Sequence, residues 1–117
     1  MKITIYHNPR CGKSRQTLAL LEARGIEPEV VEYLKTPPDA ATLKALLKKL
    51  GLRPRQLLRI KEAAYQEAGL DDQSLSDEAI IGAMLEHPIL IERPIVVVGN
   101  RAALGRPPEG VLAILPT

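Results

Sequence analysis

Hydrophobic and polar positions alternate at the start of the chain and then change to a helical period. Residues 2–6 alternate as a strand does, and residues 13–24 have apolar side chains at helical spacing until Gly25 ends the run. The valine-rich residues 29–33 predict a second strand. A strand, a helix and a second strand within about thirty residues indicate a βαβ unit with parallel strands and a right-handed crossover.

The middle of the chain has a helical pattern throughout. Residues 36–39 (Thr-Pro-Pro-Asp) form a helix-start signature with Thr36 as the capping residue, and leucines at helical spacing follow until Gly51. Short helices are expected over residues 53–69, and Ser76 opens a further helix. We therefore predict an all-helical insertion at about residues 38–87.

The last part of the chain predicts two more strands and a final short helix. Residues 94–98 are strongly β-forming, Gly99-Asn100 is a two-residue hairpin turn, and residues 101–104 form the return strand. Residues 107–109 (Pro-Pro-Glu) open the last helix. The order β-α-β, helical insertion, β-β-α predicts an α/β fold with a four-stranded mixed sheet, and 117 residues suit a single domain over residues 1–117.

Composition narrows the class of protein. The chain has neither Trp nor Phe, so its core must be aliphatic, and a net charge of +2 spread along the sequence is too weak to indicate a nucleic-acid partner. No apolar run approaches the ~20 residues that cross a bilayer. A strand begins at once, without a signal peptide, so we expect a cytoplasmic protein that spans no membrane.

Cys11, the only cysteine, lies between the first strand and the first helix. A helix N-terminus and basic neighbours lower a thiol pKa from about 8.5 to as little as ~3.5–7.5, because free backbone N–H groups and the helix dipole favour an anion. At pH 7 a pKa of ~8.5 leaves about 3% thiolate, whereas a pKa of ~6 gives about 90%. We therefore interpret Cys11 as a reactive thiolate. The same loop can hold an oxyanion, and its basic candidates are Arg10, Lys13 and Arg15.

Other interpretations of this loop are weaker. A lone cysteine is often a small buried hydrophobe, but flanking Arg10 and Gly12 make a poor core position. A nucleotide P-loop needs glycine where His7 stands, and a tyrosine phosphatase needs arginine where Thr17 stands. Residues 11–14 instead match a C-x-x-C redox motif whose second cysteine is Ser14. Its hydroxyl can donate to the thiolate, and a second, compatible role is helix capping or first-turn polarity.

The chain resembles the glutaredoxin-dependent arsenate reductases, which have a thioredoxin-like fold with a helical insertion. The resemblance covers essentially the whole chain. Its matching segments are Tyr6-His7-Asn8-Pro9 with Cys11, Ser14-Arg15, Tyr33-Leu34 with Thr36-Pro37, Leu57-Leu58-Arg59, His87-Pro88-Ile89-Leu90-Ile91 with Arg93-Pro94-Ile95-Val96-Val97, and Arg106-Pro107.

The resemblance implies a set of site residues. Cys11 corresponds to the catalytic cysteine that attacks arsenate, and His7 to a histidine that helps to ionise it. Three arginines that hold the oxyanion correspond to Arg59, Arg93 and Arg106. Pro94 corresponds to a cis-proline facing the cysteine. Neither a bound cofactor nor a metal is implied.

The resemblance also implies a reaction and its partners. Arsenate is reduced to arsenite through a cysteine–arsenate adduct, with glutathione as co-substrate and glutaredoxin as the partner that regenerates the thiol. The single cysteine agrees independently with an external thiol donor, because the chain has no resolving thiol. We expect a monomer.

Three other functions stay open. The first is an Spx-type redox regulator that binds RNA polymerase; Ser14 in place of the second cysteine and the complete arginine set argue against it. The second is a monothiol glutaredoxin-like carrier that acts on glutathione mixed disulfides. The third is a scaffold with a vestigial oxyanion site.

Overall fold

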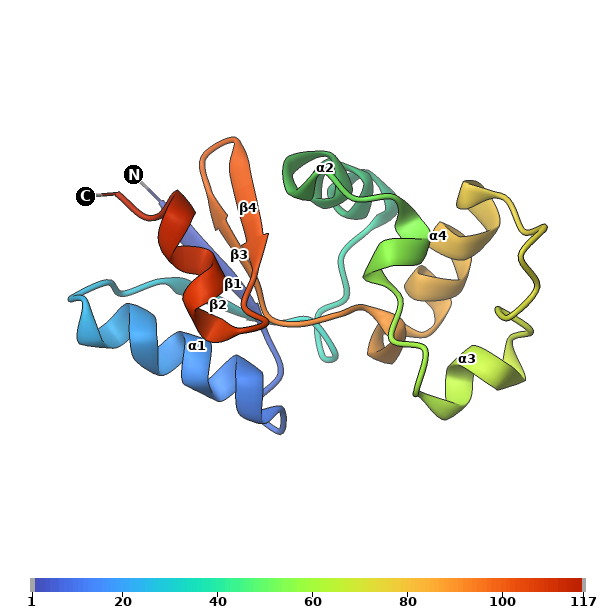
Figure 1. Ribbon diagram of the computed structural model, residues 1–117, viewed down its shortest axis with the longest axis horizontal. Helices are drawn as coiled ribbons and strands as arrows, with labels where there is room; N and C mark the ends of the chain where they lie inside the picture. Colours follow the sequence, from blue (N-terminus) through green and yellow to red (C-terminus); the bar gives the residue numbers. More distant parts are fainter. Residues whose placement is uncertain (1, 117) are drawn as a thin grey trace. The chain divides into compact units, whose positions relative to one another are not determined.

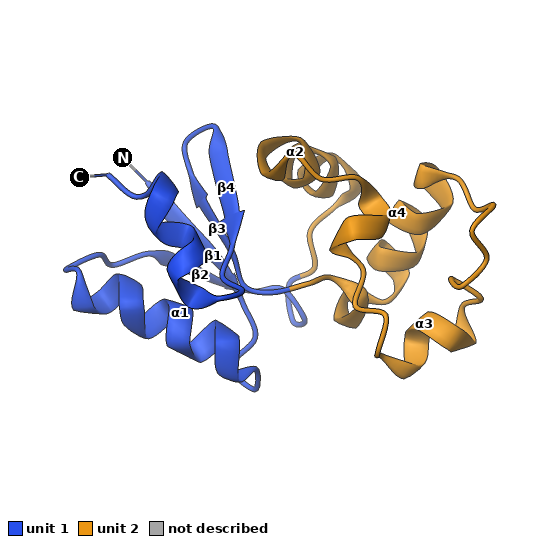
Figure 2. Cartoon of the chain, viewed as in Figure 1, with its two compact units in different colours: residues 1–36, 93–117 blue, residues 37–92 orange. Residues whose placement is uncertain are grey.

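The computed structural model describes residues 2–116, and the chain divides into two compact units (Figure 2). The first unit contains the described residues up to Thr36 and from Arg93 onward, and the second runs from Pro37 to Glu92. Among residues 2–116, no helix is long and apolar enough to cross a membrane.

A four-stranded mixed sheet forms the first unit (Figure 1). Its strands are β1 (Ile3–His7), β2 (Glu29–Glu32), β3 (Ile95–Val98) and β4 (Arg101–Leu104), in the order β2-β1-β3-β4. β1 is parallel to β2 and antiparallel to β3, and β3 is antiparallel to β4. The predicted α/β class, the βαβ unit and the mixed sheet are confirmed.

An aliphatic core closes one face of this sheet. α1 (Gly12–Ala23) and the 3-10 helix η3 (Pro108–Ile114) lie on the same side of the strands (Figure 1). The alternation expected for β1 places Ile3 and Ile5 in the core. The buried members of the cluster are Ile3, Ile5, Leu21, Val96, Val98, Val111, Ile114 and Leu115. Burial of these side chains fixes which face of each strand points to the helices.

The β3–β4 hairpin turns at the predicted two residues. Val98 pairs with Arg101, so Gly99 and Asn100 form the loop between them. Gly99 has φ +61°, the left-handed conformation that such a turn needs and that glycine adopts without steric penalty. The turn therefore sets the register in which β4 returns along β3.

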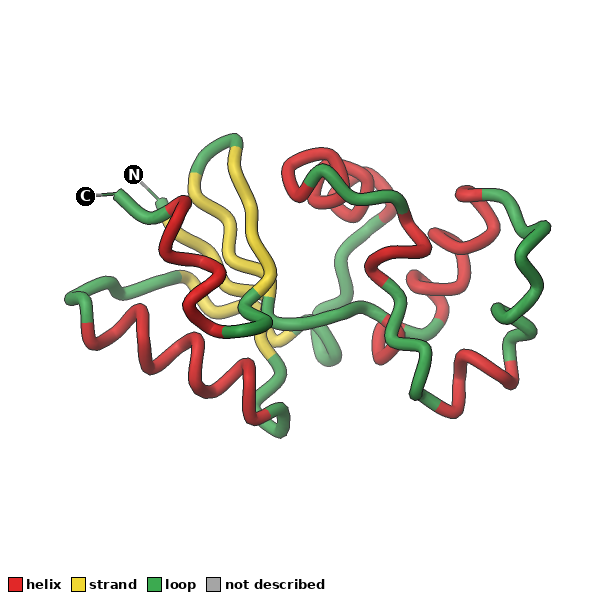
Figure 3. Tube along the Cα trace, in the orientation of Figure 1, coloured by secondary structure: helices red, strands yellow, loops and turns green. Residues whose placement is uncertain are grey.

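The second unit is helical apart from one isolated bridge (Figure 3). It contains α2 (Ala40–Leu50), η1 (Pro54–Leu57), α3 (Ala63–Glu67), α4 (Asp77–Glu86) and η2 (Pro88–Leu90). Leu58 forms a bridge with Ile91, and the Glu92 N–H donates to the Leu57 carbonyl. The second unit therefore ends at Glu92, five residues after the end of the predicted insertion at residues 38–87. That the whole chain folds as a single domain stays a prediction.

The helix starts in this unit agree with the sequence in one case and differ in another. Ser76 is the N-cap of α4, as expected, and its hydroxyl accepts from the Ala79 N–H. For α2, Thr36 as the capping residue is wrong: the N-cap is Asp39, whose carboxylate accepts from the Thr42 N–H at 2.8 Å. The two prolines after Thr36 keep the chain extended until Asp39, where an acceptor meets the helix's free N–H groups.

Leu21→Ala tests the core of the first unit. Leu21 is fully buried, and its truncation should lower the free energy of unfolding by about 2–5 kcal/mol through lost burial and an unfilled cavity. Leu34, which is 39% exposed, provides the matched control, and Leu34→Ala should change stability by less than about 0.5 kcal/mol. Urea unfolding followed by circular dichroism measures both; equal losses would contradict the assignment of the core.

Candidate active site

The register of the sheet brings three distant chain segments to one end of the first unit. Tyr6, near the end of β1, pairs with Ile95 at the start of β3, and Ile95 pairs with Leu104 at the end of β4. The chain that follows β1, the chain that precedes β3 and the chain that follows β4 therefore leave the sheet at the same edge. These segments carry Cys11, Arg93 and Arg106.

Cys11 is the N-cap residue of α1 and is partly exposed. Its backbone is extended, and its N–H donates to the Asn8 carbonyl at 2.9 Å, which closes the loop after β1. The backbone N–H groups of Ser14 and Lys13, in the first turn of α1, act on the sulfur and lower the pKa of Cys11. The thiol therefore lies at the N-terminus of a helix, where free backbone N–H groups favour an anion.

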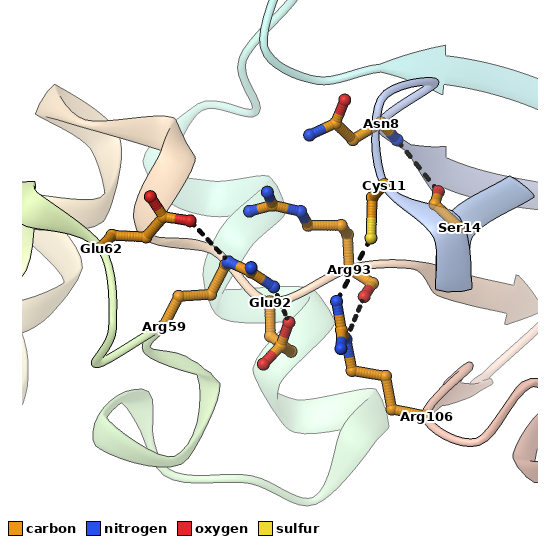
Figure 4. A network of polar contacts seen from close by, with 8 residues as sticks. All are labelled: Asn8, Cys11, Ser14, Arg59, Glu62, Glu92, Arg93 and Arg106. Carbon is orange, nitrogen blue, oxygen red and sulfur yellow. Dashed lines mark hydrogen bonds and ion pairs between the residues drawn. The ribbon is translucent and has the colours of Figure 1, made fainter.

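Arg106 approaches the same sulfur from the end of β4 (Figure 4). Its Nη2 lies 3.2 Å from Cys11 Sγ, and its Nε donates to the Arg93 carbonyl at 2.7 Å. Nε and Nη2 lie on the same edge of the guanidinium, so the carbonyl contact at Nε helps to direct Nη2 at the sulfur. A cation and two backbone donors therefore surround the thiol.

These contacts decide the protonation state of Cys11. Burial is the largest effect and raises the thiol pKa, because a charged sulfur loses hydration. The Ser14 N–H, the Arg106 charge, the Lys13 N–H and the Arg93 charge all lower it, and together they outweigh burial. The pKa of Cys11 is therefore below that of an ordinary cysteine, which increases the fraction of the thiol present as thiolate.

His7 and Ser14 form a buried pair behind the loop. Ser14 Oγ lies 2.6 Å from His7 Nδ1 and accepts from the Asn8 N–H at 3.0 Å. The Ser14 hydroxyl thus contacts His7 and Asn8, and the expected hydrogen bond from it to the thiolate stays a prediction. The backbone N–H of Ser14 acts on the sulfur, and the N-cap is Cys11, with Ser14 in the first turn.

The environment of His7 favours a neutral imidazole. Burial lowers the pKa of His7 most strongly, the Glu32 carboxylate opposes this, and the Arg15 charge lowers the pKa further. A neutral ring whose Nδ1 accepts a hydrogen bond from the Ser14 hydroxyl suits the 2.6 Å contact. His7 therefore reaches the Cys11 loop through Ser14, and its part in ionising the thiol stays a prediction.

Asn8 is a site residue that the sequence analysis did not single out. It is 5% exposed, its Oδ1 accepts from the Arg10 N–H at 3.0 Å, and its carbonyl accepts from the Cys11 N–H. The Asn-Pro dipeptide at positions 8 and 9 is a turn signal and could have identified it. Asn8 thus holds both ends of the turn that presents the cysteine.

The remaining basic candidates occupy different places. The side chains of Arg10, Lys13 and Arg15 are exposed, and Arg15 Nη1 donates to the Pro9 carbonyl at 2.9 Å. Arg93 is buried in the first unit at 5% exposure. The Arg93–Pro94 peptide bond is cis, which confirms the conformation expected of Pro94, and the Arg106–Pro107 bond is also cis.

Arg59 belongs to the second unit, where two glutamates contact its guanidinium. Its Nε donates to Glu62 at 3.1 Å and its Nη1 to the Glu92 carboxylate (Figure 4). Burial lowers the pKa of Arg59, but the hydrogen bonds and charges of the two glutamates raise it by more. The guanidinium is held between two carboxylates, and its role in oxyanion binding stays a prediction.

The arrangement in the first unit suits attack on an oxyanion. A thiol of lowered pKa at a helix N-terminus can supply a nucleophile, and backbone N–H groups and guanidinium groups can complement negative charge on a tetrahedral substrate. Covalent catalysis by a thiolate needs this combination, since the nucleophile and its anionic target repel each other unless cations lie between them.

Comparisons with known proteins agree with this geometry. Residues 6–114 match the ArsC family. The chain is 59% identical to the uncharacterised protein YfgD of Escherichia coli K12, with 97% of each chain covered. It is 56% identical to an arsenate reductase of Rhizobium meliloti, with 99% of this chain and 83% of the relative covered.

A solved structure extends the likeness to three dimensions. An arsenate reductase from Vibrio cholerae superposes with a TM-score of 0.95 at 56% identity, and the match covers 98% of both chains. This confirms the thioredoxin-like fold expected from the sequence. With a family match over nearly its whole length and close relatives of almost equal extent, the chain belongs to the ArsC family.

Proposed function

We propose that this protein is an arsenate reductase in which Cys11 is the nucleophile and Arg106 and Arg93 stabilise the oxyanion. The observation that carries the proposal is the contact of 3.2 Å between Arg106 Nη2 and the sulfur of Cys11, the N-cap residue of α1. Relatives named arsenate reductase, at 48–56% identity over nearly the full chain, support the same reaction.

The first step forms a sulfur–arsenic bond. The Cys11 thiolate attacks arsenic, and one arsenate oxygen leaves as water after protonation. Arsenate is mostly a dianion near neutral pH, so guanidinium groups that make charge-assisted hydrogen bonds lower the repulsion between it and the thiolate. The partial exposure of Cys11 leaves the sulfur accessible to this substrate.

The second step reduces arsenic. Glutathione adds to the adduct, and a disulfide bond forms between its sulfur and Cys11 while the Cys11–arsenic bond breaks. The electron pair of that bond passes to arsenic, which changes from the pentavalent to the trivalent state and leaves as arsenite. Two thiols are oxidised to one disulfide, which balances the two electrons that arsenic gains.

Regeneration requires an external thiol because Cys11 is the only cysteine. We propose glutaredoxin as the partner that removes glutathione from Cys11 by thiol–disulfide exchange. This cycle needs a reducing compartment, which is why we assign the protein to the cytosol. The proposed chemistry uses no bound cofactor, and the co-substrate is glutathione.

The direct test is arsenate reduction with glutathione and glutaredoxin, omitting each component in turn. Arsenite should form only when all are present, and Cys11→Ser should abolish its formation, because the hydroxyl is a poor nucleophile at neutral pH. Circular dichroism checks that the variant is folded. Turnover by Cys11→Ser would remove this sulfur from the mechanism. Disulfide exchange without any arsenate turnover would indicate a monothiol carrier instead.

Arg106→Gln tests the contact with the sulfur. Loss of the charge should raise the pKa of Cys11, so the pH midpoint for alkylation by iodoacetamide should move upward. Arsenate turnover at limiting substrate should fall on the order of ten- to a hundredfold, the range for a charged hydrogen bond. Arg101→Gln, at the exposed first residue of β4, is the control and should leave both quantities unchanged. A midpoint that stays in place in Arg106→Gln would exclude this role.

Arg93→Ala and Arg59→Ala test the other two arginines assigned by resemblance. Each should weaken turnover at limiting arsenate by about 1–3 kcal/mol, because a dianionic substrate loses a guanidinium partner. Thermal unfolding of each variant separates this effect from lost stability, which is a particular concern for Arg59 because Glu62 and Glu92 lose their shared cation. An unchanged rate in a folded variant would exclude that arginine from substrate binding.

A further inference from the structure

Gly105 lies between β4 and Arg106 and is buried. Unlike Gly99, it has no positive φ, so its backbone conformation is open to any residue. Space is what excludes a side chain: an added Cβ would lie 2.3 Å from Thr17 Oγ1 and 2.6 Å from Pro94 Cγ. Both distances are well inside van der Waals contact, so a methyl group here must push α1 or the chain before β3 away.

Thr17 forms the other half of this contact. It is fully buried in α1, its hydroxyl donates to the Lys13 carbonyl at 2.9 Å, and the same oxygen lies 3.4 Å from the Gly105 carbonyl. The Gly105 N–H donates to the Pro94 carbonyl at 3.0 Å. Three segments that are distant in sequence thus meet at one point with no room for another atom.

Each of these segments continues directly into the Cys11 site. Arg106 follows Gly105, Arg93 precedes Pro94, and Lys13, whose N–H faces the sulfur, lies one helical turn before Thr17. The 3.2 Å contact between Arg106 and Cys11 therefore spans two elements whose separation is set where Gly105 packs on Thr17. A shift at this point changes the distance between guanidinium and sulfur.

We propose that Gly105 and Thr17 are positioning residues whose close packing sets the distance between the Arg106 guanidinium and the Cys11 sulfur. Neither residue touches the reacting atoms. Their effect on arsenate turnover rests on the proposed function, whereas their effect on the thiol can be measured without arsenate.

The alternative is that Gly105 only completes the packing of the fold. A packing role lowers stability but leaves the thiol environment unchanged in molecules that are folded. The pH profile of Cys11 alkylation distinguishes the two, because it reports the charge and hydrogen bonds around the sulfur.

Gly105→Ala is the principal test, made on the full chain and read by the pH midpoint of iodoacetamide alkylation. The midpoint should move upward, toward that of Arg106→Gln, and alkylation below the midpoint should slow severalfold. Gly82→Ala is the matched control, since an added Cβ at that exposed position in α4 meets no atom within 4 Å. It should leave the midpoint unchanged.

Two further variants keep the test decisive. Gly105→Ala combined with Thr17→Ala removes two of the three closest atoms, Thr17 Oγ1 and Cγ2, and should return the midpoint part of the way. Thr17→Val keeps the branched shape and loses only the hydroxyl; it should fold even if Gly105→Ala does not, and should raise the midpoint. An unchanged midpoint in folded Gly105→Ala, or in Thr17→Val if the former does not fold, overturns the proposal.

Arsenate turnover is measured on the same variants as a separate readout. If the unaltered protein reduces no arsenate but the alkylation midpoints shift as described, the proposed function fails and the positioning inference stands. If arsenate is reduced normally and the midpoints of the variants do not move, the positioning inference fails alone.

Discussion

The charge on one sulfur is the constraint around which the first unit is arranged. Partial burial of Cys11 raises its pKa, and nearby N–H and guanidinium groups lower the pKa by more than burial raises it. The backbone N–H groups of Ser14 and Lys13 do so locally, and the Arg106 guanidinium does so at 3.2 Å from a position 95 residues away in the sequence. The two backbone N–H groups are placed by the formation of α1 alone, whereas the position of the Arg106 guanidinium depends on assembly of the whole sheet.

The directions of the strands in the mixed sheet bring Arg106 close to Cys11. Because β3 runs antiparallel to β1 and β4 antiparallel to β3, the end of β1, the start of β3 and the end of β4 share one edge of the sheet. A nucleophile that follows a strand can thus receive cations from two other chain segments without a long loop. Arg106 gains its orientation from the Arg93 carbonyl, so the backbone of one segment directs the side chain of another.

His7 and the Ser14 hydroxyl stabilise the loop that carries Cys11, whereas other groups act on its sulfur. The Ser14 hydroxyl contacts His7 and accepts from the Asn8 N–H, while the Ser14 backbone N–H lowers the pKa of Cys11. A neutral His7 buried behind the loop can hold its shape but adds no positive charge near the thiol. The cations that act on the sulfur are therefore arginines, which stay charged at every physiological pH.

The sequence by itself determined most of the elements and the position of the cysteine that we propose as the nucleophile. Alternation in β1, the Gly99 turn, the Ser76 cap and the lone cysteine before a helix are local signals, because strand period, turn chemistry and capping depend on neighbours in the chain. Resemblance, not spacing, singled out Arg93 and Arg106 among sixteen basic residues. Only the tertiary structure decided that Arg106 meets the sulfur, that the Ser14 hydroxyl turns to His7, and that Gly105 leaves no room beside Thr17. Those facts depend on strand register and on packing between segments far apart in sequence, which no local pattern encodes.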